Sequence, residues 1–351
     1  MAKRDGYFDT LKFTLILLVI FGHAIVLGLN NSNIIKGLYV FIYTFHMPLF
    51  IFVSGYFSKK MTINKINEFT LRFIEIYIVC QFIWFVLEGG VLEWIHEVPS
   101  FNEVWSSIKY YIIMPYGYLW YIISLVFWKY MVFFTKKINS KILLLISFTA
   151  SFLIGFIDFN GGILSISRTI SFFPFFLLGY YCTKEHIDII RSRKRLIYLI
   201  IPIVAFILSF SPYCLKYPRV EELSYGKYAF SYFNTPDWLD FIVRIGFIVA
   251  AIAMSIVFMM FCKSSKFFLK YGEKTLLFYI YHLYILWILK RIMFKTFGMD
   301  INIITLSIQA ILTIIVLMVM SRFKIFEVAL NPISSFINRQ KSTSFKMLNS
   351  N

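Results

Sequence analysis

The sequence predicts an all-α, polytopic integral membrane protein with about ten transmembrane helices and both termini in the cytoplasm. The chain of 351 residues is 59% hydrophobic and only 15% charged, which lies far outside the usual composition of soluble domains. Its apolar runs are long enough to cross a bilayer, which takes about 17–25 helical residues. Its basic residues gather in alternate connecting segments, as they do on the cytoplasmic side of membrane proteins.

The apolar runs follow one another along the chain with short connections between them. The fifth and sixth runs are short, and the longest connection, about 213–240, is too small to hold an independent core. We therefore predict one membrane-embedded domain over residues 1–325 and a cytoplasmic tail over residues 326–351. The predicted spans are roughly 8–29, 37–57, 70–92, 112–134, 142–158, 168–183, 196–212, 241–262, 273–291 and 302–321.

Charged residues set the expected orientation. With a cytoplasmic amino terminus, every inner connection is rich in lysine and arginine, and the outer connections hold most of the acidic residues. The net charge of +17 is then mostly a signal of topology, so we expect membrane lipids and no nucleic acid as partners. No small-residue cleavage site follows the first apolar run, which predicts a retained span instead of a signal peptide. The many Ile, Lys, Asn and Phe residues are typical of AT-rich bacterial genes, so we expect a bacterial plasma membrane protein.

The first two spans contain ionisable residues that hydrocarbon disfavours. Asp9, Lys12 and His23 lie in the stretch YFDTLKFTLILLVIFGHAIVLG, and His46 lies in FIYTFHMPLFIFVSGYF. An ionisable side chain at mid-bilayer costs about 2.5–3.5 kcal/mol on insertion scales, so such residues usually have a function. We therefore expect the functional site to include them.

Helical geometry places the polar residues of the first span on one face. The eleven-residue step from Lys12 to His23 is about three turns, which puts both side chains on one stripe roughly 16 Å apart. Asp9 lies one turn before Lys12 on nearly the same stripe. The second span returns through the membrane, so His46 can reach the level of His23, and Pro48 removes a backbone hydrogen bond near that level. This pattern predicts a face that leads from a charged cytoplasmic mouth to two histidines.

The later spans add polar and aromatic features. Arg168 lies at the outer end of the sixth span, and His282 lies inside the ninth. His282 is either a substrate contact or a hydrogen-bond partner for a neighbouring helix. The stretch PYGYLWYIISLVFWK opens the fourth span, and its rings most simply form an interfacial belt, although aromatic faces also stack on sugar rings.

The combination of histidines with a basic side chain restricts the chemistry. Histidine is the usual general base near neutral pH, and lysine or arginine commonly binds phosphate. Together they suit a phosphate-bearing acyl donor whose thioester reaches a histidine that deprotonates an acceptor hydroxyl. A proton-coupled transporter or flippase for a glycan or small metabolite would place histidines and charges on one stripe in the same way, so the residues alone leave both functions open. The four cysteines show no paired spacing, and we expect neither a disulfide nor a metal site.

Four stretches resemble the acyltransferase family 3 membrane proteins. FDTLKFTLILLVIFGHA is similar to the first-helix motif of that family, in which an aspartate, a basic residue and, eleven positions later, a histidine recur. FHMPLFIFVSGYF resembles its second-helix motif, while SRTISFFPFFLLGYY and LFYIYHLYIL resemble later segments of the fucose 4-O-acetylase branch. The resemblance implies a ten-helix membrane O-acyltransferase that moves an acetyl group, usually from acetyl-CoA, to a hydroxyl of a cell-surface glycan.

The resemblance also implies roles for single residues. Lysine stands at position 12 where much of the family has arginine, so paired contacts with phosphate become single contacts. The proline that often follows the family's later arginine is absent after Arg72. The expected residues are, as catalytic groups, Asp9, His23 and His46; as contacts of acetyl-CoA, Lys12 and Arg72; and as contacts of the acceptor, Arg168 and His282.

The expected function is therefore O-acetylation of a capsule, cell-wall or exopolysaccharide sugar, or of its lipid-linked precursor. Acetyl-CoA is the expected donor, and we expect no permanently bound cofactor. The sequence has no fused esterase-like domain of the kind some family members contain. We therefore expect the chain either to complete the transfer alone or to pass the acetyl group to a separate polysaccharide-assembly protein.

Overall fold

The computed structural model describes residues 6–88, 101–158, 162–193 and 195–329. These residues form helices joined by turns, without a strand among them. The α-helices are α1 (Gly6–Ile25), α2 (Asn33–Tyr56), α3 (Ile63–Glu88), α4 (Phe101–Ile113), α5 (Trp120–Thr135), α6 (Ser140–Leu153), α7 (Ile166–Tyr181), α8 (Lys184–Ser192), α9 (Ile200–Ser209), α10 (Pro212–Lys216), α11 (Val220–Leu223), α12 (Asp237–Phe261), α13 (Lys266–Gly272), α14 (Thr275–Lys290), α15 (Ile303–Met320) and α16 (Lys324–Ala329). Short 3₁₀ segments are η1 (Val26–Gly28), η2 (Gly117–Leu119), η3 (Ile154–Phe156), η4 (Ile163–Ser165), η5 (Leu196–Leu199) and η6 (Phe230–Phe233), and η7 (Arg291–Thr296) is a π-helix.

The described helices confirm the all-α, polytopic membrane fold. Eight of them, counted with their short extensions, are long and apolar enough to cross a membrane. Two shorter apolar helices, Ser140–Phe156 and Leu196–Ser209, correspond to the fifth and seventh predicted spans. The sixth predicted span is longer than expected, because η4 extends α7 to give an apolar helix over Ile163–Tyr181. The boundary predicted between residues 325 and 326 falls inside α16, and most of the predicted tail lies outside the described residues.

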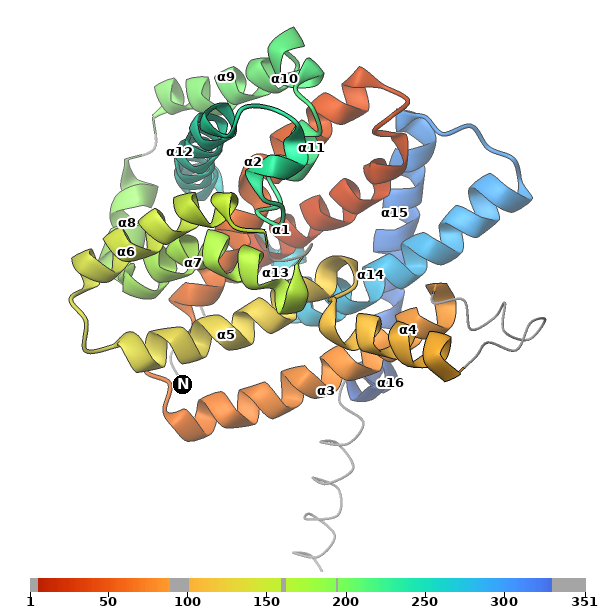
Figure 1. Cartoon of the computed structure of the whole chain (residues 1–351), viewed down its shortest axis with the longest axis horizontal. Helices are drawn as coiled ribbons and strands as arrows, with labels where there is room; N and C mark the ends of the chain where they lie inside the picture. Colours follow the sequence, from red (N-terminus) through yellow and green to blue (C-terminus); the bar gives the residue numbers. More distant parts are fainter. Residues whose placement is uncertain (1–5, 89–100, 159–161, 194, 330–351) are drawn as a thin grey trace, which may run out of the picture.

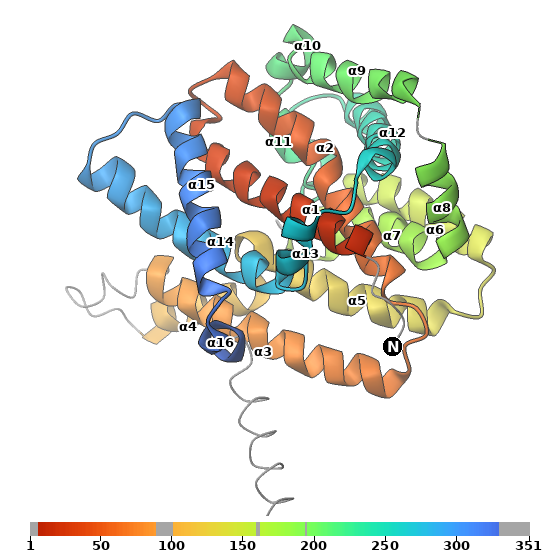
Figure 2. The same ribbon diagram turned by 180° about the vertical axis from the view of Figure 1, so that it is seen from behind.

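Helix α1 lies in the interior of the bundle. It contacts α2, α13, α14 and α15, and Figures 1 and 2 show it enclosed by these helices. Apart from the stripe that holds Asp9, Lys12 and His23, α1 is mostly apolar around its circumference, so protein can surround it. Its position gives the side chains of α1 access to several other helices at once.

Helices α2 and α7 pack closely through two glycines. A Cβ atom at Gly55 would overlap the carbonyl oxygen of Phe176, and one at Gly179 would overlap the carbonyl oxygen of Phe52. Small residues allow the two backbones to approach closely. In a membrane, lipid tails are as apolar as the helices, so van der Waals packing of this kind drives helix association instead of the hydrophobic effect. Helix α2 continues as a single helix through Pro48.

The connection between α9 and α12 folds into short helices that cover one end of the bundle. Its Phe230 and Phe233 side chains are fully buried. Asp240, at the start of α12, accepts hydrogen bonds from Tyr217 and from Thr235, the latter at 2.6 Å. This connection is too short for a core of its own, but it is anchored on α12 and packs against α2 through α10 and α11.

Candidate active site

A cavity of about 210 Å³ lies where α1, α2, α7 and α14 meet the segment after α11. Its lining includes His23 of α1, His46 of α2 and Arg168 of α7. Tyrosine and tryptophan rings form much of the remaining wall. The structure therefore brings together three of the residues predicted for the site, each from a different helix.

His23 is the accessible histidine of the group. Its side chain is partly exposed, whereas His46 is 1% exposed and His282 is completely buried. The ring centroid of His23 lies 5.2 Å from that of His282 and 6.4 Å from that of Tyr43. Tyr43 in turn contacts His46 at 4.6 Å between ring centroids. The three histidines thus form one cluster in which His23 faces the cavity.

Backbone hydrogen bonds fix the proton positions in the other two rings. Nδ1 of His46 lies 2.8 Å from the carbonyl oxygen of Ile42, and Nδ1 of His282 lies 2.7 Å from that of Tyr279. A carbonyl oxygen only accepts, so each Nδ1 is the donor, and in a neutral ring Nε2 then holds the lone pair. Nε2 of His282 is buried without a hydrogen-bond partner. His282 does not line the cavity; it packs against His23, and its Nε2 lacks a hydrogen-bond partner.

Arg168 is held between aromatic rings. Its guanidinium carbon lies 5.0 Å from the centroid of Trp120 and 5.7 Å from that of Tyr225. Its Nε is buried without a hydrogen-bond partner. Leu164 and Ser165, just before α7, adopt left-handed backbone conformations, which are unfavourable for non-glycine residues and persist only where the surroundings enforce them.

A tyrosine cluster closes the cavity on the side of the α11 segment. Tyr39 and Tyr43 stack at 3.8 Å between centroids, and the hydroxyls of Tyr39 and Tyr225 lie 2.5 Å apart. Burial raises the pKa of Tyr225 to about 12, so this residue keeps its phenolic proton at physiological pH. Tyr225 lies in the long connection before α12, for which we predicted no role. In the sequence, the aromatic residues of that connection were the only feature that could have indicated a role for Tyr225.

The aromatic start of the fourth span is also part of the wall. Tyr118 and Trp120 line the cavity and are 2% and 8% exposed. The interpretation of these rings as an interfacial belt is therefore wrong, because they point into the protein instead of toward lipid head groups. The spacing within PYGYLWY could not reveal this, since the direction of the rings depends on how η2 and α5 dock.

Asp9 and Lys12 lie toward the opposite end of α1. Their side chains form an ion pair of 2.9 Å, and Nζ of Lys12 lies 5.5 Å from the ring centroid of Phe57. Neither residue lines the cavity, and Ile16, between Lys12 and His23 on the same stripe, is fully buried. Asp9 thus does not contact the histidine cluster, and the catalytic role predicted for it stays a prediction.

Arg72 lies in the first half of α3 with an exposed side chain. It does not line the cavity around His23. Its predicted contact with acetyl-CoA stays a prediction. Among the residues that the structure describes, no group of three or more His, Cys, Asp or Glu side chains is arranged to bind a metal ion.

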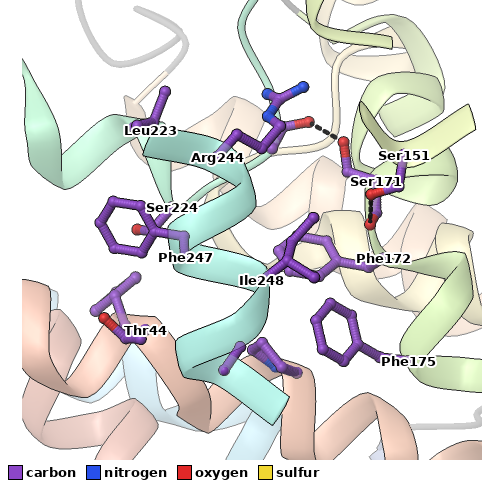
Figure 3. A pocket seen from close by; sticks show the side chains of 14 residues that line it. Thr44, Ser151, Ser171, Phe172, Phe175, Leu223, Ser224, Arg244, Phe247 and Ile248 are labelled. Atoms are coloured by element: carbon purple, nitrogen blue, oxygen red, sulfur yellow. Dashed lines mark hydrogen bonds between the residues drawn. The ribbon is translucent and has the colours of Figure 1, made fainter. Parts of the chain in front are cut away.

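A smaller hollow of about 50 Å³ adjoins the cavity and shares Tyr43, Phe172 and Ser224 with it. Figure 3 shows Arg244 of α12 at this hollow, opposite Ser171 of α7. The Arg244 side chain is 5% exposed and stacks on Phe230 at 4.7 Å. Unlike Arg168, it has a carboxylate one turn earlier on its own helix, at Asp240.

Comparison with known proteins places the chain in a family. Residues 5–322 match the family model described as an acyltransferase domain. The nodulation protein NolL of Mesorhizobium japonicum is 28% identical over 127 residues, which are 34% of this chain and 33% of that protein. The matched segment is thus about a third of the relative's length, and no solved structure is significantly similar. Because the family match covers nearly the whole chain, this protein belongs to the acyltransferase family 3 and is a multi-pass membrane acyltransferase.

Proposed function

We propose that this protein is an O-acetyltransferase of the bacterial plasma membrane. It moves an acetyl group from acetyl-CoA to a sugar hydroxyl of a cell-surface polysaccharide or of its lipid-linked precursor. The observation that supports this most is one cavity in which an accessible histidine, backed by a second histidine, faces a wall of aromatic rings. Family membership supplies the acyl transfer; the acetyl group and the sugar acceptor are the proposal.

His23 is the general base in this proposal. Its ring nitrogen takes the proton of the acceptor hydroxyl while the hydroxyl oxygen attacks the thioester carbonyl of acetyl-CoA. The tetrahedral intermediate then collapses, the carbon–sulfur bond breaks, and the thiolate of CoA receives the proton from the His23 imidazolium. Base catalysis of this kind contributes about 10²–10⁴-fold to a rate. His282 orients the His23 ring from behind, and His46 contributes its Nε2 to the cavity wall.

The aromatic wall suits a sugar. Tyrosine and tryptophan combine a flat apolar face with a polar edge, so they can pack on a pyranose ring and bind its hydroxyls. Tyr43, Tyr118 and Tyr279 are among the rings that line the space in front of His23. A sugar hydroxyl would then approach the base from the open part of the cavity.

The donor's charged groups belong at the other end of α1. Lysine binds phosphate as a point charge, and Lys12 keeps 24% of its side chain exposed beside Asp9. In the proposal, Asp9 holds Lys12 in position until the phosphates of acetyl-CoA replace or share this contact, and Arg72 adds a second positive charge. Membrane lipids and polysaccharide-assembly proteins remain predicted partners.

Proton NMR of surface polysaccharide tests the function. Polysaccharide is compared from a deletion strain, from that strain with the wild-type gene, and from that strain with His23→Ala or His186→Gln. His186 lies on α8 with an exposed side chain and serves as the matched control. We expect O-acetyl signals to vanish on deletion, return with wild type and His186→Gln, and stay absent with His23→Ala at an equal protein level. Unchanged acetylation with less exported polymer would instead indicate a transporter.

A further inference from the structure

We propose that the acceptor is an acidic glycan whose carboxylate or phosphate binds Arg168 while its hydroxyl lies at His23. This inference rests on the proposed function and names the class of its acceptor. Its basis is a partly buried guanidinium whose Nε is buried without a partner and which has no opposite charge, in the same cavity as the proposed base.

The cavity provides no negative charge for Arg168. No aspartate or glutamate is among the residues that line it. Within the described part of the chain, Arg168 forms no ion pair, and its buried Nε has no hydrogen-bond acceptor. Glu221, on the neighbouring α11, pairs with Lys36 at 3.2 Å. Because a buried charge is costly unless it is paired, the arrangement indicates that an anion from outside completes it.

The rings beside Arg168 prepare it for such an anion. Trp120 and Tyr225 contact the guanidinium through their ring faces, so they restrict its orientation without using its N–H groups. The N–H groups at the edge then remain available for a planar carboxylate or a phosphate, which arginine binds through two parallel hydrogen bonds. A neutral sugar alone would leave this charge unpaired.

The phosphates of acetyl-CoA do not explain Arg168. In that molecule the whole pantetheine arm separates the phosphates from the thioester. Arg168 and His23 line one cavity of about 210 Å³, so a guanidinium there cannot reach the phosphates while the thioester carbon is at His23. The acceptor is the remaining reactant. Because Arg168 and His23 line the same small cavity, its anionic group must lie on the acetylated sugar or on the sugar next to it.

Arg244 provides a matched contrast. Like Arg168, it stacks on an aromatic ring and has a buried side-chain nitrogen without a hydrogen-bond partner, and it lies in the adjoining hollow (Figure 3). It differs in having Asp240 one turn away on α12 and in facing a space of only about 50 Å³. A variant at Arg244 therefore removes a buried guanidinium without removing the proposed acceptor contact.

The test uses the full-length chain purified in detergent with acetyl-CoA labelled in its acetyl group. Three acceptors are compared: methyl glucoside, methyl glucuronide and methyl glucoside 6-phosphate. We expect wild type to acetylate at least one acidic acceptor with kcat/KM about 10- to 100-fold above that for the neutral glucoside, as a charge-assisted contact implies. The preferred acidic acceptor distinguishes a carboxylate-bearing glycan from a phosphate-bearing one.

Variants then assign the preference to Arg168. Arg168→Gln should reduce the ratio of kcat/KM for acidic acceptors to kcat/KM for the neutral acceptor to about 1, mainly by raising the KM for acidic acceptors. Arg168→Lys should retain part of this preference, and Arg244→Gln should leave it unchanged. Because the ratio is internal to each preparation, it does not depend on how much protein folds. Equal rates with acidic and neutral acceptors in wild type would overturn the inference. So would an Arg168→Gln effect on kcat that is the same for all acceptors, since that indicates stabilisation of the tetrahedral oxyanion.

A binding measurement separates this inference from the proposed function. The melting temperature of the protein is recorded with methyl glucuronide, methyl glucoside 6-phosphate and methyl glucoside. An upward shift with an acidic sugar that is absent for Arg168→Gln supports the anion site even if none of the sugars is acetylated, in which case only the proposed function fails. The lack of any shift with both acidic sugars, together with transfer to the neutral sugar, refutes the anion site and leaves the function intact.

Discussion

The two ends of α1 present polar side chains in opposite circumstances. Near its start, Asp9 and Lys12 neutralise each other through an ion pair between neighbouring turns of one helix. Near its other end, His23 faces a cavity together with Arg168 and in front of His282, and the last two have buried nitrogens without partners. Because an unsatisfied buried group is costly, we infer that the second end binds a ligand, whereas the ion pair at the first end is complete without one. We therefore expect changes at the His23 end to affect chemistry and changes at the Lys12 end to affect donor binding.

His23→Gln should give the largest effect. Without the base, the transfer rate should fall about 10²–10⁴-fold, while the KM for acetyl-CoA stays near its wild-type value. Steady-state kinetics with labelled acetyl-CoA measure both constants, and His186→Gln is the control for loss of a histidine elsewhere. If His23→Gln raised only the KM for acetyl-CoA, the functional distinction between the two ends of α1 would fail.

Lys12→Gln should give the next largest effect, and it should change KM instead of kcat. Loss of a charge-assisted contact to phosphate should raise the KM for acetyl-CoA about 10- to 100-fold with kcat nearly unchanged. Lys12→Arg should keep or improve donor affinity, because arginine binds phosphate through paired hydrogen bonds. A fall in kcat with an unchanged KM would place Lys12 in the chemical step instead.

Gly55→Ala tests whether the His23 end depends on the packing of α2 against α7. The added methyl group would overlap the backbone of α7, so we expect a loss of about 1–3 kcal/mol of stability and a lower kcat. Gly246→Ala on α12 is the matched control, since a Cβ there meets nothing within 4 Å. Thermal unfolding in detergent measures the difference. Equal melting temperatures for the two variants would refute the close contact.

Tyr225→Phe should give the smallest effect. It removes one hydroxyl contact with Tyr39, which is worth about 0.5–1.5 kcal/mol, so the KM for the acceptor should rise about two- to tenfold. Since burial raises the pKa of Tyr225 to about 12, the contact is fully present below about pH 10 and is lost only as the pH rises through about 12. The pH profile of the variant should therefore keep its shape up to about pH 10. Tyr213→Phe, at a position 92% exposed, is the control.

Properties that depend on a single helix were predictable from the sequence. The length of each apolar run determined the spans, because a bilayer requires a hydrophobic helix of fixed length. The 3.6-residue period placed Asp9 one turn before Lys12 on nearly the same stripe, and in the structure their side chains form an ion pair. The presence of His23 on the same stripe also followed from helical geometry alone.

Tertiary packing decided what surrounds His23. The site combines side chains from α1, α2, η2, α5, α7, α14 and the segment after α11, and no local period specifies which helices meet. The belt interpretation of Tyr118 and Trp120 failed for this reason, because the direction of a ring depends on the docking of its helix. Between α2 and α7, the docking depends on the close backbone approach at Gly55 and Gly179, and in a membrane such packing depends on shape complementarity rather than on hydrophobicity. The sequence by itself thus determined the helices and the ionisable residues within them, while the tertiary structure decided which of those residues share a cavity.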